Sequence, residues 1–275
     1  MNKIGSSETI RKTTFNFYNY TKNIVSHKKT INVDFLEWFI GFVEKHGSFI
    51  VSNNRLFFII NQEQEKILHS IRTNLGFGKV STYKTYSRFI VADKNNIDRL
   101  IFIFNGNLLL DKTNTFFVFW LNARNSYSIE KIEYLNKNKL ICFKNNAWLS
   151  GFIDAEKCFN SVKQKDVKCK IGFTVNLRFI VDQKNEIFIL EKIKSFLKSG
   201  NIHSRHTVKD MYRLVVSHRK SHEILIQYLH RYPLRTIKKL SYVRFCCILR
   251  YSLDLSNYPS TEKGLRKLER LIKNI

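Results

Sequence analysis

Acidic residues are scarce in this chain. Its 275 residues include 22 Asp and Glu against 47 Lys and Arg, which leaves a formal net charge of +25 at pH 7. A net charge of this size exceeds what solubility requires and predicts a polyanionic partner. Nucleic acid is the first candidate, and a membrane surface is the second.

Long apolar runs are also missing. The longest run, residues 115–121, is far shorter than the roughly 18 to 20 apolar residues of a membrane-spanning helix. The basic residues are interleaved with 12 Tyr and 23 Phe along the chain, whereas a lipid-binding protein usually concentrates its charge on one amphipathic helix or tail. We therefore expect nucleic acid, and no membrane, as the partner.

Paired cysteines and prolines are few. The five cysteines show no CxxC spacing, and their odd number suits a reducing compartment, so we expect neither disulfides nor a zinc site. Only two prolines occur, while Asn, Lys, Ile, Tyr and Phe are abundant. This bias is typical of an AT-rich gene and predicts an organellar, mitochondrial protein.

The first 33 residues lack a sustained apolar period. They carry six Lys and Arg against one acid, Glu8, and no apolar segment follows the first charges as it would in a secretory signal. The composition favours a basic arm over residues 1–33. A transit peptide is the alternative.

An internal repeat organises the chain from Phe35 onward. The segment Phe-Ile-Gly-Phe-Val-Glu-Lys-His-Gly-Ser-Phe at 39–49 recurs as Leu-Ser-Gly-Phe-Ile-Asp-Ala-Glu-Lys-Cys-Phe at 149–159. Three further pairs of segments match downstream: 58–62 with 179–183, 78–80 with 200–202, and 88–91 with 213–216. The chain therefore contains two similar units, which we place at residues 34–140 and 141–275.

Each unit switches between helical and strand periods in the same order. Apolar spacing near 3.6 residues alternates with spacing of two, which predicts helix, two strands, helix, two strands, helix. The predicted fold class is α+β, with two pseudo-symmetric αββαββα repeats in one monomer. Their curved antiparallel sheets would form a basic, saddle-shaped platform for nucleic acid.

Basic residues recur on the predicted strands and their connecting loops. Alternation along a strand sends one set of side chains to the core and the other to one exposed face. We expect the following residues to bind nucleic acid there: Arg55, Lys79, Lys84, Arg88, Lys163, Lys165, Lys168, Lys170, Arg178, Arg205 and Arg213. For any single lysine, an ordinary solvated position is the competing interpretation.

The repeated segments at 41–47 and 151–157 resemble the motif of the LAGLIDADG family of homing endonucleases and RNA maturases. The resemblance covers residues 34–275. In that family the two motif helices pack side by side through small residues, which Gly41, Gly151, Ser150 and Ala155 provide. The acid at the eighth motif position of each helix helps to hold divalent metal against the scissile phosphates.

The eighth position differs between the two copies. The second copy has Glu156, but the first has His46. Mg²⁺ prefers oxygen ligands, so a neutral imidazole is a poor replacement for a carboxylate. Glu44 cannot substitute, because residues two apart on a helix point to nearly opposite sides.

The ninth position also departs from the family pattern. Gly47 is retained, but Lys157 replaces the second glycine. If this position needs a positive φ angle, Lys157 is strained or moves the acid. Together with Lys45 it places two ammonium groups near the metal position. The family further uses polar and basic residues around the acids, and Gln62, Gln183, Lys112 and Lys238 match such positions.

Three functions fit these features. The first is a cleavage-impaired protein that binds structured RNA, as a maturase or together with other proteins in an organellar ribonucleoprotein such as the mitochondrial ribosome; it needs no cofactor. The second is an active DNA endonuclease or nickase that uses Glu156 and Mg²⁺. The third is a duplex-DNA-binding regulator, which would bind one sequence without cutting it.

Overall fold

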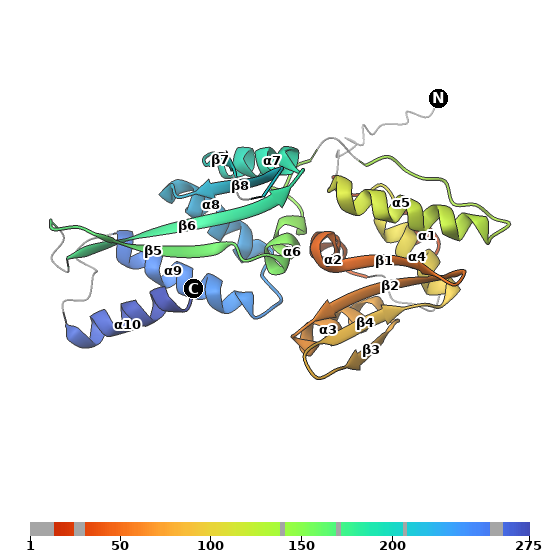
Figure 1. Ribbon diagram of the computed structural model, residues 1–275, viewed down its shortest axis with the longest axis horizontal. Helices are drawn as coiled ribbons and strands as arrows, with labels where there is room; N and C mark the ends of the chain where they lie inside the picture. The colour runs from red at the N-terminus through yellow and green to blue at the C-terminus, as the bar shows by residue number, and fades with distance from the viewer. Residues whose placement is uncertain (1–13, 25–30, 138–140, 169–171, 206–207, 254–260) are drawn as a thin grey trace, which may run out of the picture.

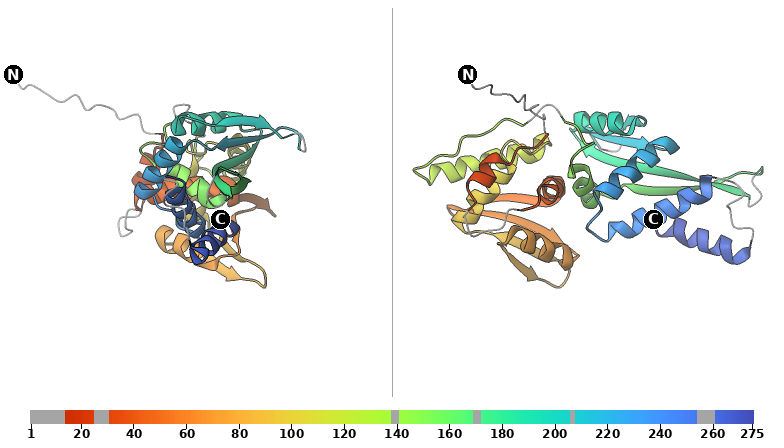
Figure 2. Two further views of the ribbon diagram at one scale, coloured as in Figure 1. Left: turned by 90° about the vertical axis from the view of Figure 1, so that its left-hand side faces the viewer. Right: turned by 180° about the vertical axis from the view of Figure 1, so that it is seen from behind.

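We describe a computed structural model of the chain, covering residues 14–24, 31–137, 141–168, 172–205, 208–253 and 261–275. It consists of two repeats that meet at two helices, α2 (Val33–His46) and α6 (Trp148–Ala155). Figures 1 and 2 show these helices side by side at the junction, with one repeat on each side. Among the described residues, no helix has the length and apolar character needed to cross a membrane.

The first repeat follows the predicted order and adds one helix after it. After α2 come β1 (Gly47–Ser52), β2 (Arg55–Gln62), α3 (Glu65–Leu75), β3 (Lys79–Thr82), β4 (Ser87–Val91), α4 (Lys94–Phe104) and α5 (Asp111–Ser126). A short helix, α1 (Tyr18–Lys22), precedes them and contacts α4.

The second repeat has the same order and ends in two additional helices. After α6 come β5 (Phe159–Lys165), β6 (Phe173–Lys184), α7 (Ile187–Leu197), β7 (Asn201–Ser204), β8 (Met211–Val216), α8 (Arg219–Arg231), α9 (Lys238–Leu253) and α10 (Glu262–Lys273). The αββαββα prediction is therefore confirmed for both repeats, while α5, α9 and α10 extend it.

Each repeat contains one antiparallel four-stranded sheet. The strand orders are β1-β2-β4-β3 and β5-β6-β8-β7, so the sheets correspond strand by strand. Burial alternates along β6, where Phe173, Val175, Leu177, Phe179 and Val181 are buried on the face that packs against helices. We call the opposite face of each sheet its open face.

The motif helices approach so closely that only glycine fits at two positions. A Cβ atom on Gly41 would lie 2.0 Å from the carbonyl oxygen of Trp148, and one on Gly151 would lie 1.9 Å from the carbonyl oxygen of Trp38. Real Cβ atoms do not approach backbone oxygens this closely. The small residues of the motif therefore set the distance between the two repeats.

Part of the expected basic arm is packed into the fold. Phe15, Phe17 and Tyr20 are buried in the main core, and the backbone N–H of Asn16 donates to the side chain of Asn107. The described part of the arm, residues 14–24, therefore packs against the fold through these aromatic side chains, while Tyr18 between them remains exposed. Three aromatic side chains supply apolar area that outweighs the surrounding charge.

The additional helix α10 closes a second, smaller core. Leu268 of α10 is buried against Phe173, Val175 and Leu177 of β6 and against Phe245 of α9. This core lies under the far end of the long β5–β6 hairpin (Figure 1). It covers the helix-facing side of that hairpin, where two lysines of β5 lie.

Candidate nucleic-acid interface and cleavage centre

The sixth motif position of each repeat carries a buried acid with a structural role. Glu44 accepts hydrogen bonds from the backbone N–H groups of Leu109 and Leu110 at the start of α5, at 2.5 and 3.3 Å. Asp154 accepts from the backbone N–H of Arg235, at 2.7 Å, and from the Trp38 indole, at 2.9 Å. Glu44 thus holds the segment that leads into α5, and Asp154 holds the segment that leads into α9.

Burial changes the protonation of these two acids. It raises the pKa of Glu44 to about 8 and raises the pKa of Asp154, although the N–H donors act in the opposite direction. Asp154 lines neither of the two clefts described below, and Glu44 lines only the smaller one. Because backbone N–H groups already bind both carboxylates, neither acid is free to replace an acid of the cleavage centre.

The eighth position of the second repeat is already engaged by a cation of the protein. Glu156 Oε1 lies 2.5 Å from Nζ of Lys45 and accepts a hydrogen bond from Nε2 of Gln183 at 3.0 Å. Lys45 and Glu156 belong to different repeats, so this ion pair bridges the junction. An ammonium group therefore occupies one side of the only motif-end carboxylate.

The eighth position of the first repeat is held as a neutral imidazole. Burial, together with the nearby ammonium groups of Lys238 and Lys45, lowers the pKa of His46 to about 4. The ring contacts Phe42, with 4.9 Å between ring centroids, and hydrogen-bonds the backbone of Ala155 in the other repeat. His46 thus serves as a packing residue at the junction.

The ninth position does not use a positive φ angle. Gly47 has φ −75°, and Lys157 is not among the described non-glycine residues with positive φ. The strain expected for Lys157 is therefore wrong. Gly47 is needed for space instead, because a Cβ there would lie 2.5 Å from Cγ1 of Val43. The other expectation, a displaced acid, matches α6, which ends at Ala155 and leaves Glu156 extended.

Two clefts flank the motif ends and divide the remaining site residues between them. His46, Gln62, Glu156 and Lys238 line a cleft of about 1030 Å³ that both repeats form. Lys238 donates from Nζ to the backbone oxygen of Glu156 at 2.8 Å. The second cleft, of about 420 Å³, is lined by residues that include Lys45, Lys112 and Gln183.

The residues at the motif ends do not fit a divalent metal. Mg²⁺ needs several oxygen ligands, but here one carboxylate is paired with Lys45 and the opposite position is a neutral imidazole. Within the described ranges, no group of three or more His, Cys, Asp and Glu side chains could hold a metal ion. We therefore derive no metal-dependent step for this centre.

The open faces carry some, but not all, of the expected basic residues. Strand register places Arg178 opposite Asn160 and Arg213 opposite Asp182, all on the open face of the second sheet. In the first sheet, Arg88 pairs with Asn61 and Lys79 with Ile90. Arg55, Lys84 and Lys168 are exposed at strand ends and turns, and Lys170 lies outside the described residues.

Two lysines face the other way. Lys163 is opposite Val175 and Lys165 is opposite Phe173, so both lie on the helix-facing side of β5. Lys163 pairs with Glu269 of α10 at 2.8 Å and lies 3.9 Å from the centre of the Phe173 ring. The expectation that they share a face with Arg178 is wrong. Phe159 faces the core, and Lys163 and Lys165 lie four and six residues further along the same strand, so they point to the same side as Phe159.

Matching arginines in the two sheets have partners of different charge. Arg88 Nε donates to Oδ1 of the neutral Asn61 at 2.9 Å. Arg213 donates twice to the carboxylate of Asp182, at 2.7 Å each, and Arg205 joins the same carboxylate at 3.0 Å. Asp182 neutralises part of the second face. This difference in charge was not predicted, although Asn61 and Asp182 occupy matching positions of the repeat.

Comparisons with known proteins agree with this geometry. A family model described as LAGLIDADG endonuclease matches residues 149–249. Over 228 residues, 79% of this chain, the sequence is 37% identical to "Probable intron-encoded endonuclease 4" of Neurospora crassa. Over 257 residues, 86% of the chain, it is 23% identical to "Intron-encoded RNA maturase bI4" of Saccharomyces cerevisiae. The matches span only 40% and 37% of those two relatives.

A solved structure shows the same fold. The I-LtrWI LAGLIDADG homing endonuclease, bound to its target DNA, superposes with a TM-score of 0.70 over 89% of this chain and 98% of that chain, at 20% identity. The repeat order, the glycine contacts between the motif helices and the intron-encoded relatives all agree. The chain belongs to the LAGLIDADG family of homing endonucleases and maturases, in its single-chain, two-repeat form, with degenerate motif ends.

Proposed function

We propose that this chain binds structured RNA, as an intron maturase would, and has lost the double-strand cleavage of its family. The observation that carries the proposal is the ion pair between Lys45 and Glu156, with the neutral His46 at the matching position. Metal-assisted cleavage needs carboxylates that are free to hold a cation. Binding needs neither of these positions.

The charge distribution supports a nucleic-acid partner. The chain carries a net charge of +25, and Arg88 and Arg178 lie on the open faces of the two sheets. Phosphate contacts of this kind give affinity without sequence readout. RNA is favoured because a relative that aligns with 86% of the chain is named an RNA maturase. A mitochondrial location is proposed from the amino-acid bias, which is typical of an AT-rich gene, and from the intron-encoded relatives.

A second candidate is a site-specific DNA endonuclease or nickase that uses Glu156 and Mg²⁺. One observation favours it: Glu156, Gln62 and Lys238 still line one cleft of about 1030 Å³, which would admit a phosphate backbone. With only one of the two acids left, the cleavage rate should fall by orders of magnitude, because metal ions supply several kcal/mol of transition-state stabilisation.

Cross-linking of the native protein distinguishes these functions. The protein is irradiated in its organelle, purified under denaturing conditions, and the attached nucleic acid is sequenced. We expect enrichment of intron RNA. Enrichment of ribosomal RNA would support the ribonucleoprotein version of the proposal. Enrichment of one duplex DNA site without RNA would contradict RNA binding and favour the endonuclease, or a DNA-binding regulator if that site is not cut.

A further inference from the structure

Two stacked tyrosines, Tyr83 exposed and Tyr86 half-buried, mark the tip of the β3–β4 hairpin. The backbone N–H of Tyr83 donates to the carbonyl of Tyr86 at 2.8 Å, which closes the turn through Lys84 and Thr85. The two rings stack with 4.9 Å between centroids and 21° between planes. Tyr83 nevertheless remains 48% exposed. The hairpin thus holds a preorganised aromatic surface that the core does not use.

An arginine with a neutral partner completes the cluster. The Arg88 guanidinium lies 5.6 Å from the centre of each tyrosine ring and donates to Tyr86 Oη at 3.4 Å. Its other recorded hydrogen bond goes to Asn61 Oδ1, which carries no charge. Arg88 therefore keeps its positive charge for a ligand, unlike Arg213, which is paired with Asp182.

We propose that Tyr83, Tyr86 and Arg88 form a binding site for one unpaired nucleobase and its phosphate. The base would stack on the Tyr83 ring, and Arg88 with the adjacent Lys84 would bind the phosphate. A base inside a duplex is already stacked on its neighbours, so the site selects unpaired nucleotides. This inference rests on the proposed nucleic-acid binding and adds a preference that general basicity does not explain.

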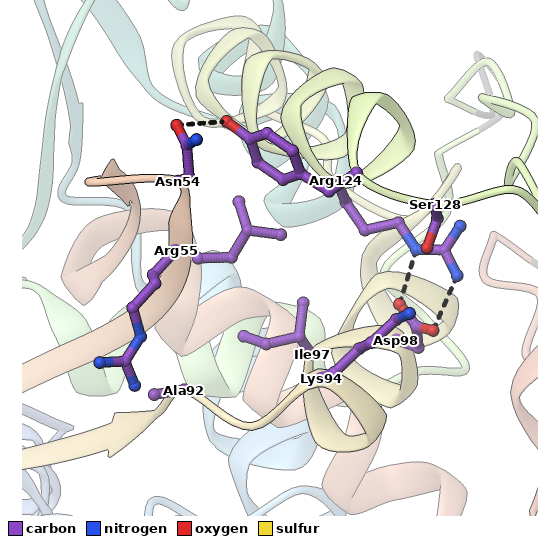
Figure 3. Close-up of a pocket in the computed structure, with 10 residues that line it drawn as sticks. Asn54, Arg55, Ala92, Lys94, Ile97, Asp98, Arg124 and Ser128 are labelled. Carbon is purple, nitrogen blue, oxygen red and sulfur yellow. Dashed lines mark hydrogen bonds and ion pairs between the residues drawn. The ribbon is translucent and has the colours of Figure 1, made fainter.

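Another pocket with basic residues lacks these properties. It has a volume of about 210 Å³ and lies where the β1–β2 turn, α4 and α5 meet (Figure 3). Its Arg124 guanidinium donates to both carboxylate oxygens of Asp98 at 2.8 Å each, so its charge is compensated. The nearby Tyr127 is also 48% exposed, but it donates to Asn54 at 3.4 Å and stacks on no other ring in the described part of the chain. Tyr127 is therefore a matched control for Tyr83.

Binding of short oligonucleotides by the full chain tests the site. The probes are a fluorescent single-stranded RNA, a single-stranded DNA of the same sequence and the corresponding DNA duplex. Tyr83→Leu should weaken binding of both single strands about tenfold, since base stacking on an aromatic ring contributes about 1–3 kcal/mol. Duplex binding should be unchanged. Tyr83→Phe should restore binding, and Tyr127→Leu should leave all three affinities unchanged.

The outcomes separate this inference from the proposed function. A loss in RNA alone still supports the site and identifies RNA as its ligand. Equal effects of Tyr83→Leu and Tyr127→Leu, or a loss on the duplex as large as on the single strands, would overturn the site. If the unaltered chain binds neither these probes nor a folded intron RNA, the proposed function itself is wrong. Matching thermal unfolding curves confirm that the variants are folded.

Discussion

Nζ of Lys45 lies 2.5 Å from Oε1 of Glu156, and this ion pair joins the ends of two motif helices that belong to different repeats. Both side chains are partly buried, at 28% and 22% exposure. The contact places a cation of the protein itself against the Glu156 carboxylate. A carboxylate that served cleavage in the family would here help to hold the repeats together.

A double-mutant cycle measures this contact. Lys45→Met, Glu156→Gln and the double variant should show a coupling of about 1 kcal/mol in the free energy of unfolding, because the pair is partly shielded from water. The matched control is the pair Lys163–Glu269, exposed at 46% and 53%, whose coupling should stay below about 0.5 kcal/mol. Equal couplings in the two cycles would contradict a structural role for Glu156.

The two helix-contact glycines should tolerate no side chain. Gly41→Ala and Gly151→Ala each push a methyl group into a backbone carbonyl, so we expect a loss of at least about 3 kcal/mol in the free energy of unfolding. Gly76→Ala is the control, since its φ of +75° costs about 1 kcal/mol but no atom lies within 4 Å of the new Cβ. Denaturant unfolding compares them, and similar losses would refute the close contact.

Stability should fall as the pH rises from about 4.5 to 7, in part because of Glu37. This residue is 8% exposed and accepts a hydrogen bond from Ala147 N–H at 2.9 Å. Burial raises the pKa of Glu37 from 4.5 to about 7, so the folded state prefers the protonated acid. The stability gained from that preference is complete below pH 4.5 and is lost as the pH passes 7.

The variant Glu37→Gln isolates this contribution. Its amide oxygen can accept the same hydrogen bond without a charge, so its stability relative to the unaltered chain should increase by up to about 3 kcal/mol between pH 4.5 and 8. Thermal or denaturant unfolding at several pH values gives the comparison. A difference that does not vary with pH would show that Glu37 ionises normally.

Two basic residues on opposite sides of the second sheet test whether its open face binds nucleic acid. Arg178→Gln should weaken nucleic-acid binding and lower the slope of log affinity against log salt concentration by about one, as expected for one lost phosphate contact. Lys163→Gln should change neither value, because Lys163 faces α10. Equal effects in a salt titration would mean that both sides of the hairpin contact the ligand.

The repeat made much of the fold predictable. Paired copies of the motif and of the downstream segments indicated the order of elements, and the family resemblance implied the helix contact at the glycines 41 and 151. The burial of Phe15, Phe17 and Tyr20 was not predicted, because the net basic composition of their segment concealed these three aromatic side chains. Strand parity counted from Phe159 could have placed Lys163 correctly.

The centre was only partly predictable. The substitution at His46 and the two nearby lysines were visible in the motif, but their partners were not. Lys45 meets Glu156, and Glu44 meets Leu109, only after the chain has folded, and such contacts have no local spacing to reveal them. Alignment of the two copies could have shown that Arg88 faces the neutral Asn61 and that Arg213 faces the acidic Asp182.

Strand cleavage of the nucleic acid recovered by cross-linking tests the central claim most directly. The purified chain is incubated with that RNA, and with the matching duplex DNA, in Mg²⁺ or in EDTA, and the strands are separated on a denaturing gel. We predict intact strands in both conditions. Breaks that need Mg²⁺ and disappear in Glu156→Gln, with binding retained, would contradict the loss of the cleavage centre.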